Sequence, residues 1–307
     1  MKIAIAGSGA LGSSFGFMLQ KGGHDVTLMD YWDEQIQTIR EHGLTANVNG
    51  VIETIRIPID KPENIQDSFD VVFMFTKSMG LRHMLKAIAH TLTVDTKIVC
   101  LLNGLGHAKT IAEYIPTKNI IMGTTVWTAG LDAPGKVHLM GHGPVEIQES
   151  DPSGKSETLA IVKVLQDCGL NGVYSEDVHF TTWRKACVNG TMNSLSAILD
   201  ANIEELFSST QTHAMVKEIV KEFAAAAEID GVDLNVDEIV DYINQASVNL
   251  GSHYPSMHQD ISNRRFTEID FLNGTVAKMC EDNNIPAPYC RLITQLIHAK
   301  EEILGVK

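Results

Sequence analysis

The chain has 307 residues, with 38 Asp and Glu against 24 Lys and Arg, so its formal net charge is −14. So acidic a surface repels phosphate backbones and anionic lipids, which argues against nucleic-acid and membrane partners. The hydrophobic fraction of 44% is typical of a globular protein. Because a domain usually has roughly 100–200 residues, the length predicts two domains.

The cysteines and the start of the chain bear on location. The five cysteines form no C-x-x-C pair, and most lie within apolar runs, as buried reduced thiols do. Met1-Lys2 leads directly into a strand pattern, so we expect no signal peptide. We also expect no membrane span, and together these features predict a cytoplasmic protein. The histidines lack zinc-like spacing, so we expect no metal.

In the first part of the chain, short apolar runs alternate with amphipathic segments. Strands are predicted at Lys2–Ala6, Asp25–Asp30, Val71–Thr76, Lys97–Leu102 and Asn119–Thr124, and helices at Leu11–Lys21, Asp33–His42 and Leu81–Thr91. This alternation predicts βαβ units and a parallel sheet that is covered on both faces. Glycines and a proline between Gly135 and Gln148 separate β-rich runs, which favours an antiparallel hairpin there.

Helical patterns then follow one another to the end of the chain. They are predicted at Glu157–Asp167, Glu176–Leu199, Ala214–Asp230, Asp237–Leu250, Thr267–Asn284 and Tyr289–Leu304. We therefore predict an α/β fold in which a Rossmann-type, mostly parallel sheet domain over residues 1–170 precedes an all-helical C-terminal domain over residues 171–307. The first would bind a dinucleotide, and the second would hold the substrate and the catalytic groups.

The first predicted turn carries a dinucleotide-binding motif. Gly7-Ser8-Gly9-Ala10-Leu11-Gly12 fits G-x-G-x-x-G, follows the strand Lys2–Ala6 and opens a helix. In this motif Gly7 permits the tight turn, Gly9 lets the backbone approach a pyrophosphate, and Gly12 lets helix and strand pack closely. The helix N-terminus attracts the phosphates. We expect all six residues to bind the cofactor.

The end of the second strand bears on the choice of cofactor. Asp30 lies 18 residues after Gly12, near the spacing expected of an acid that accepts hydrogen bonds from the adenosine ribose. A carboxylate there repels a 2′-phosphate, and no Lys or Arg lies between Met29 and Gln37. We therefore favour NAD(H), with NADP(H) as the alternative. Asp30 could instead be a solvated strand-end residue, with Tyr31 and Trp32 under the adenine.

Polar side chains at other strand ends and on one helix suggest the reaction site. Lys77 and Asn103 each follow a predicted strand, at the edge of the sheet where cofactors bind. Lys185, Asn189 and Asn193 are spaced i, i+4 and i+8, so one helix face presents an ammonium and two carboxamides. Asparagine disfavours helix interiors, which favours a function over a merely solvated face.

Further motifs, taken as a set, resemble one family. W-R-K-x-x-x-N begins at Trp183, S-M-x-Q-D at Ser256 and T-E-I-D at Thr267, all after the N-terminal G-x-G-A-L-G. Over nearly its whole length the chain resembles ketopantoate reductase (2-dehydropantoate 2-reductase). The resemblance implies reduction of 2-dehydropantoate to (R)-pantoate by hydride transfer from NAD(P)H, a step of pantothenate and coenzyme A biosynthesis. NADPH-using members typically have an Arg where this chain has Asp30-Tyr31-Trp32, which again supports NADH.

The resemblance also implies residue roles. Lys185 and Glu268 match the catalytic residues. The implied substrate-binding residues are Asn103, Asn189, Asn193, Asn202 and Ser256. Those implied near the cofactor are Asn103, Ala129 and Glu268, in addition to Lys77 from its strand end. Glu268 could instead be a first-turn carboxylate that stabilises its helix.

Ketone reduction explains why a lysine would serve. Hydride transfer leaves negative charge on the carbonyl oxygen, and an ammonium can both stabilise that charge and donate a proton. Burial lowers a lysine pKa while a nearby Glu268 raises it, and we expect Lys185 to stay protonated at neutral pH. Two alternatives remain: a related dehydrogenase of another small 2-oxo or 3-hydroxy acid, and a non-catalytic nicotinamide-sensing protein. We expect a small-molecule substrate and a monomer or homodimer.

Overall fold

The computed structural model describes residues 1–306, which fold as two compact units. The first comprises residues 1–102 and 107–178, and the second comprises residues 103–106 and the chain from His179 on. Residues 171–178, which the sequence analysis assigned to the second domain, group with the first unit. They do so because β12 (Gly172–Tyr174) pairs in parallel with β11 (Val145–Glu149).

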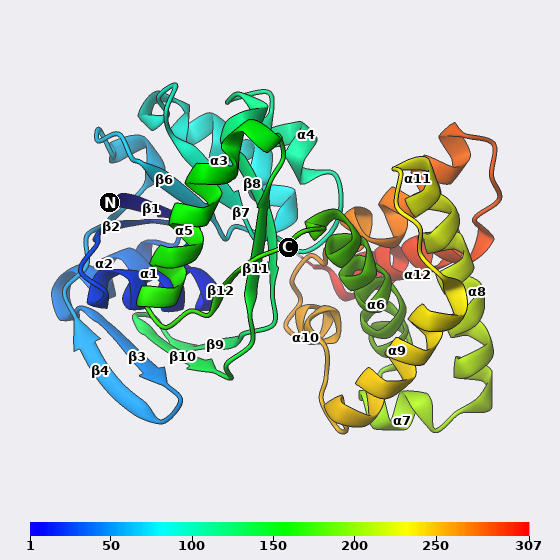
Figure 1. The fold of residues 1–307 in the computed structure, drawn as a ribbon. Helices are drawn as coiled ribbons and strands as arrows, with labels where there is room; N and C mark the ends of the chain where they lie inside the picture. Colours follow the sequence, from blue (N-terminus) through cyan, green and yellow to red (C-terminus); the bar gives the residue numbers. More distant parts are fainter. Residues whose placement is uncertain (307) are drawn as a thin grey trace. The chain divides into compact units, whose positions relative to one another are not determined.

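The first unit is built on a sheet of eight strands (Figure 1). Across the sheet their order is β12, β11, β8 (Ile120–Thr125), β7 (Lys97–Cys100), β6 (Val71–Met74), β1 (Lys2–Ala6), β2 (Asp25–Met29) and β5 (Ile59–Asp60). Every neighbouring pair is parallel except β8 and β11. The predicted Rossmann-type, mostly parallel sheet is confirmed.

Alternate residues of the strands face two separate cores. Ile3 and Ile5 pack in the core that includes α1 (Ala10–Lys21) and α5 (Lys155–Asp167). Ala4 and Ala6 face the opposite core, with α3 (Leu81–Ile88) and α4 (His107–Ile111). Because successive strand residues point to opposite faces, nearly continuous apolar strands fit this sandwich of helices. The remaining helix of this sheet, α2, spans Asp33–His42.

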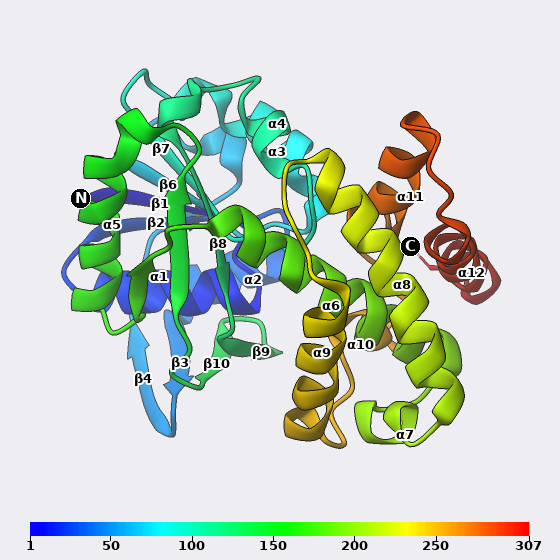
Figure 2. The same cartoon turned by 45° about the vertical axis from the view of Figure 1, so that its right-hand side comes forward.

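A second, smaller sheet was not predicted. Its order is β4 (Val51–Ile55), β3 (Leu44–Val48), β10 (Lys136–Met140) and β9 (Thr128–Ala133). The β3–β4 hairpin projects away from the main sheet (Figure 2). The expected hairpin within 135–148 is wrong, because its two strands belong to different sheets: β10 pairs with β3 and β9, whereas β11 pairs with β8 and β12.

The second unit is helical, as predicted. Its helices are α6 (Val178–Leu199, in the second unit from His179), α7 (Ile203–Phe207), α8 (Thr210–Ile229), α9 (Val236–Leu250), α10 (Ser256–Ser262), α11 (Asn273–Asp282) and α12 (Pro288–Leu304). In Figures 1 and 2, α6 runs beside α8. Gly190 of α6 makes this possible, because a Cβ there would lie 2.3 Å from the Phe223 ring of α8.

One predicted helix of the second unit is divided. Instead of a single helix over Thr267–Asn284, a short 3₁₀ helix, η6 (Ile269–Phe271), precedes α11. The break falls at Leu272, whose φ of −117° and ψ of −103° are not helical. Glu268 therefore lies at the start of η6, outside any long helix.

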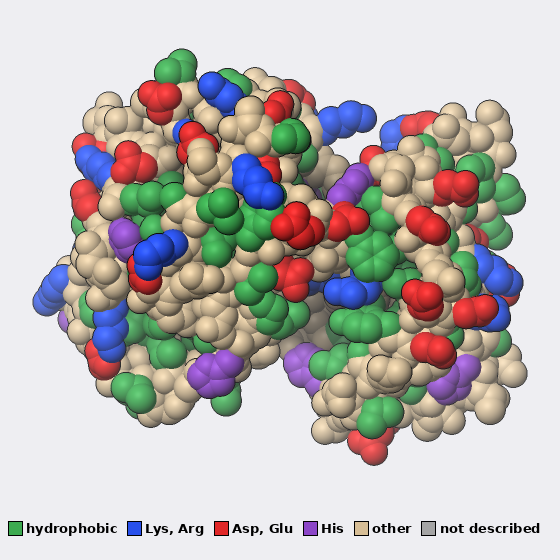
Figure 3. Space-filling model, in the orientation of Figure 1, with side chains coloured by type: hydrophobic (Ala, Val, Ile, Leu, Met, Phe, Trp, Pro, Cys, Tyr) green, Lys and Arg blue, Asp and Glu red, His purple; other side chains and the backbone are tan. Residues whose placement is uncertain are grey.

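The distribution of charged side chains and the state of the cysteines can be compared with what the composition predicts. On the face shown in Figure 3, lysine and arginine side chains are scattered among acidic ones. All five cysteines are buried and in the thiol form. Within residues 1–306, no helix combines the length and the apolar character that crossing a bilayer requires.

Candidate functional site

The glycine-rich turn between β1 and α1 leaves no room for side chains. Gly7 has φ +103°, and a Cβ there would lie 2.5 Å from the backbone nitrogen of Thr76, just after β6. A Cβ on Gly12 would lie 1.9 Å from the carbonyl oxygen of Gly7. These contacts require glycine at both positions, because any larger residue would push α1 and β6 away from the turn.

Gly9 lies in open space at the helix end. It is the N-cap residue of α1, it provides no side-chain cap, and a Cβ there would meet no atom within 4 Å. The first turn of α1 holds no acidic residue. The first N–H groups of a helix lack intrahelical acceptors and favour anions. Gly9, Ala10 and Leu11 thus form a cradle that fits the pyrophosphate of a dinucleotide.

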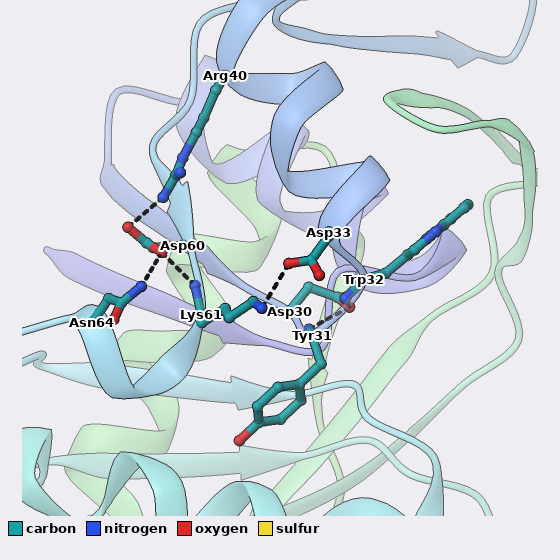
Figure 4. A network of polar contacts seen from close by, with 8 residues as sticks. All are labelled: Asp30, Tyr31, Trp32, Asp33, Arg40, Asp60, Lys61 and Asn64. Carbon is teal, nitrogen blue, oxygen red and sulfur yellow. Dashed lines mark hydrogen bonds and ion pairs between the residues drawn. The ribbon is translucent and has the colours of Figure 1, made fainter.

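Asp30 closes the same turn from the end of β2. Its Oδ2 accepts a hydrogen bond of 2.6 Å from Ser8 N. Its Oδ1 accepts bonds of 2.8 and 3.0 Å from the backbone nitrogens of Tyr31 and Trp32, which Figure 4 shows. Ser8 is buried, and its hydroxyl donates to the Met29 carbonyl. The carboxylate therefore fixes the glycine-rich loop, and Oδ2, which accepts only the bond from Ser8 N among these three, retains a lone pair for a ribose hydroxyl.

The other two residues of the first unit that were predicted to bind the cofactor, Lys77 and Ala129, lie far apart in the sequence. Lys77 is exposed and follows Thr76, the residue that contacts the Gly7 turn, so it lies at the same edge of the sheet. Ala129 lies in β9, opposite Leu139 of β10, and packs against the core beneath α1. Contacts of either residue with a cofactor remain predictions.

In the second unit, four of the predicted substrate-binding residues line one small pocket together with Glu268. The complete lining is Asn103, Asn189, Asn193, Ser256, Met257, Asp260, Glu268 and Leu272. These residues come from the 103–106 loop, α6, α10 and the η6 region. The pocket combines carboxamides, a hydroxyl and carboxylates with two apolar side chains.

Two weak hydrogen bonds link the walls of this pocket. Asn193 Nδ2 of α6 donates to Ser256 Oγ of α10 at 3.4 Å. Asn103 Nδ2 donates to Glu268 Oε2, also at 3.4 Å. The loop that carries Asn103 is fixed to the η6 region by a hydrogen bond of 2.9 Å from Leu105 N to Phe271 O. Gly104 permits this approach, because a Cβ there would lie 2.7 Å from the Phe271 carbonyl oxygen.

Lys185 lies one turn before Asn189 on α6, and its charge interacts with that of Glu268. Desolvation lowers the pKa of Lys185 from its ordinary 10.5 to about 8, although the charge of Glu268 acts in the opposite direction. At pH 7 the ammonium form therefore still predominates, with a proton that is much more easily released than that of an exposed lysine.

Asp260 is a pocket residue that was not predicted from the sequence. Its side chain is buried, and its Oδ1 accepts a hydrogen bond of 3.0 Å from Arg265 Nε. The motif S-M-x-Q-D already contains the signal, because Ser256 and Asp260 are spaced i, i+4 on one face of α10. Met257 and Leu272, the apolar lining, were also not predicted as site residues.

Asn202 is not among the residues that line the pocket within the described chain. It is the N-cap of α7: its side chain accepts a hydrogen bond of 2.9 Å from Glu205 N, and Glu205 Oε2 accepts one of 2.9 Å from Asn202 N. Such a reciprocal capping box satisfies two otherwise unpaired donors at the start of a helix. A substrate contact of Asn202 remains a prediction.

Replacing Asn202 by alanine separates these two roles. Loss of an N-cap typically costs about 1 kcal/mol, so we expect Asn202→Ala to lower the free energy of unfolding by about that amount in urea titrations. We expect the KM for the oxo acid to change less than about twofold, because the cap is local to α7. A KM that rises tenfold or more, with unchanged stability, would instead show that Asn202 binds the substrate.

Comparison with known proteins identifies the family. Residues 3–152 match the family model described as "Ketopantoate reductase PanE/ApbA", and residues 177–301 match "Ketopantoate reductase PanE/ApbA C terminal". The chain belongs to the ketopantoate reductase family. It is thus an oxidoreductase of the class that acts on CH–OH groups.

Relatives of this ketopantoate reductase family member align over their full length. The 2-dehydropantoate 2-reductase of Streptococcus pyogenes serotype M3 is 47% identical, and the alignment covers 100% of both chains. A ternary structure of D-mandelate dehydrogenase with NADH and anilino(oxo)acetate has a TM-score of 0.96 at 44% identity, again with 100% coverage of both. A structure from Enterococcus faecalis, provisionally named 2-dehydropantoate 2-reductase, has a TM-score of 0.82 at 47% identity and the same coverage.

Proposed function

We propose that this chain reduces 2-dehydropantoate to (R)-pantoate with NADH as the preferred cofactor. The first unit would hold the dinucleotide at Gly7–Gly12 and Asp30, and the second would hold the substrate. The observation that carries the proposal is the pocket in which Asn103, Asn189 and Glu268 meet, with the Lys185 ammonium within the electrostatic reach of Glu268.

Reduced nicotinamide, when bound, supplies a hydride to the ketone carbon. Lys185 then stabilises the charge that develops on the carbonyl oxygen and donates its proton to complete the alcohol. A pKa of about 8 suits this role, because the group is protonated at neutral pH yet releases its proton readily. The neutral amine recovers a proton from solvent. The charge of Glu268 favours this return to the ammonium form.

The neutral polar groups of the pocket would orient the substrate. The carboxamides of Asn189 and Asn193 and the hydroxyl of Ser256 can donate hydrogen bonds to a carboxylate and a hydroxyl group. Two carboxylates in the pocket would repel an anionic substrate, but each has a basic counterpart: Arg265 contacts Asp260, and Lys185 interacts with Glu268. The balance favours a small monoanionic oxo acid.

The proposal is tested by comparing the rates for two oxo acids, each with NADH and with NADPH. NADH oxidation is followed at 340 nm with 2-dehydropantoate and with phenylglyoxylate, and the series is repeated with NADPH. We expect the highest kcat/KM for 2-dehydropantoate with NADH. No turnover of either acid, combined with tight NADH binding, would favour the non-catalytic nicotinamide-sensing alternative.

A second candidate is an NADH-dependent reductase of another 2-oxo acid. The similarity to D-mandelate dehydrogenase favours it, since that structure contains NADH and an aromatic oxo-acid analogue. The apolar side chains of Met257 and Leu272 in the pocket would suit an aromatic or branched substituent. A kcat/KM at least tenfold higher for phenylglyoxylate than for 2-dehydropantoate would decide for this candidate.

The pKa of Lys185 predicts how the rate depends on pH. Because the amine must be protonated to act, kcat/KM should be constant below about pH 7 and fall tenfold per pH unit above about pH 8. Initial rates between pH 6 and 10 at fixed ionic strength measure this. A profile that stays flat to pH 10 would contradict proton donation by a lysine whose pKa is lowered.

A further inference from the structure

A lysine that is distant in sequence lies beside Asp30. Strands β2 and β5 are parallel, and their last paired residues are Met29 and Asp60. The next residues, Asp30 and Lys61, therefore leave the sheet side by side, and Asp30 N donates a hydrogen bond of 3.2 Å to Asp60 O. The structure thus brings a cation to the strand end where the sequence between Met29 and Gln37 provides none.

This cation is held by a second carboxylate. Lys61 Nζ lies 2.7 Å from Oδ1 of Asp33, the first residue of α2 (Figure 4). The hydrogen bond and the charge of Asp33 raise the pKa of Lys61, so the ammonium stays charged. The neighbouring Arg40 is likewise engaged, in an ion pair with Asp60 and a hydrogen bond of 3.0 Å to the Ile59 carbonyl.

We propose that Asp33 is a second determinant of NADH selectivity, because it holds the Lys61 ammonium and so withholds it from a 2′-phosphate. The inference rests on the proposed preference for NADH. A 2′-phosphate is accommodated where a cation replaces the ribose-binding acid, and here the cation is present but paired. Asp33 also adds negative charge at the first turn of α2, where a phosphate would otherwise be favoured.

The surrounding charges strengthen this barrier. Tyr31 Oη donates a hydrogen bond of 2.8 Å to Glu63 Oε1, which places another carboxylate near the strand end. Asp30, Asp33, Asp60 and Glu63 thus outnumber Lys61 and Arg40, so a doubly charged phosphate would meet net negative charge. In contrast, the ribose hydroxyls of NAD(H) need only acceptors, which Asp30 provides.

The pair can be opened without threatening the fold. The Lys61 and Asp33 side chains are 42% and 80% exposed, and ion pairs this exposed add little stability. Asp33→Asn keeps the shape of the side chain and removes its charge. We expect the Kd for NADPH to fall about two- to fivefold, the range measured for exposed charge pairs, and the Kd for NADH to change less than twofold.

Further variants test whether the released Lys61 ammonium causes the gain in affinity for NADPH. In an Asp30→Asn background, the gain from Asp33→Asn should be larger, because the acid that repels the phosphate is also neutral. Adding Lys61→Met should remove most of the gain for NADPH in both backgrounds and leave only the part that comes from the direct repulsion by Asp33, and 0.5 M salt should reduce the gain. Asp282→Asn is the matched control: it frees Lys278 in the same way on α11 and should change neither Kd.

Fluorescence titration with NADH and NADPH measures both constants without any oxo acid. An Asp33→Asn variant with unchanged Kd for NADPH, or a gain that is undiminished by Lys61→Met, would overturn the inference. The proposed function fails by different results, namely absence of turnover or a wild-type preference for NADPH. A thermal melt of each variant shows whether the fold is retained, and Asp33→Glu, which retains the charge, should restore the wild-type affinity for NADPH.

Discussion

Replacing Lys185 by alanine should lower kcat for oxo-acid reduction by about 10³- to 10⁴-fold, because in the proposed mechanism one group provides both the proton and the stabilising charge. The glycine-rich turn belongs to the first unit and Lys185 to the second, so the Kd for NADH should change less than about twofold. Stopped-flow or steady-state rates at saturating NADH measure kcat, and fluorescence titration measures the Kd.

Two further variants test the role of Lys185. Lys185→Arg keeps the positive charge, but a guanidinium does not release its proton near neutral pH. It should therefore recover at most about tenfold over Lys185→Ala, and the decline in rate above pH 8 should disappear. Lys217, paired with Asp237 on the surface of the second unit, is the matched control, and Lys217→Ala should leave kcat unchanged. A Lys185→Ala variant with near-normal kcat would remove Lys185 from the mechanism.

Replacing Glu268 by glutamine should have the second-largest effect, about 10- to 100-fold on kcat/KM at pH 7.5. Glutamine keeps an oxygen that can accept the hydrogen bond from Asn103 Nδ2, so the pocket wall should persist. The negative charge that raises the pKa of Lys185 is lost, so this pKa falls further below about 8. The alkaline decline in kcat/KM then moves to lower pH.

The pH dependence distinguishes this effect from simple damage to the pocket. Lowering the pH restores the protonated form of Lys185, so the deficit of Glu268→Gln should shrink towards pH 6. A deficit that is the same at every pH, with the alkaline limb unmoved, would show that Glu268 acts only by contacting the substrate. Near-identical circular dichroism spectra would confirm that the fold is retained.

The sequence predicted those parts of the fold that arise from local burial. β1 and α2 have their predicted bounds, because an apolar run and an amphipathic period mark each of them. β4 was missed, since it is largely exposed and so carries no apolar alternation. The 135–148 region gave a correct turn signal but a wrong pairing, because distant strands decide which sheet β10 and β11 join.

Some features of the candidate site could likewise be predicted from local sequence, whereas others depend on tertiary contacts. The spacing of Lys185, Asn189 and Asn193 on one helix face can be derived from the helical period alone. The break at Leu272 that frees Glu268 from a helix, and the ion pair between Lys61 and Asp33, depend on tertiary contacts. The family resemblance implied that Asn202 binds the substrate. In the structure its side chain caps the N-terminus of α7, a role that is independent of any substrate.

The membership of residues 103–106 in the second unit has a practical consequence for protein engineering. A chimaera that exchanged only the C-terminal half with a relative would combine a foreign helical scaffold with this chain's own Asn103 loop. In such a chimaera the hydrogen bond from Leu105 to the residue at position 271, and the close contact of Gly104 with that residue, would be formed between segments of two different proteins. Grafts intended to transfer oxo-acid specificity should therefore carry this tetrapeptide along with the helices.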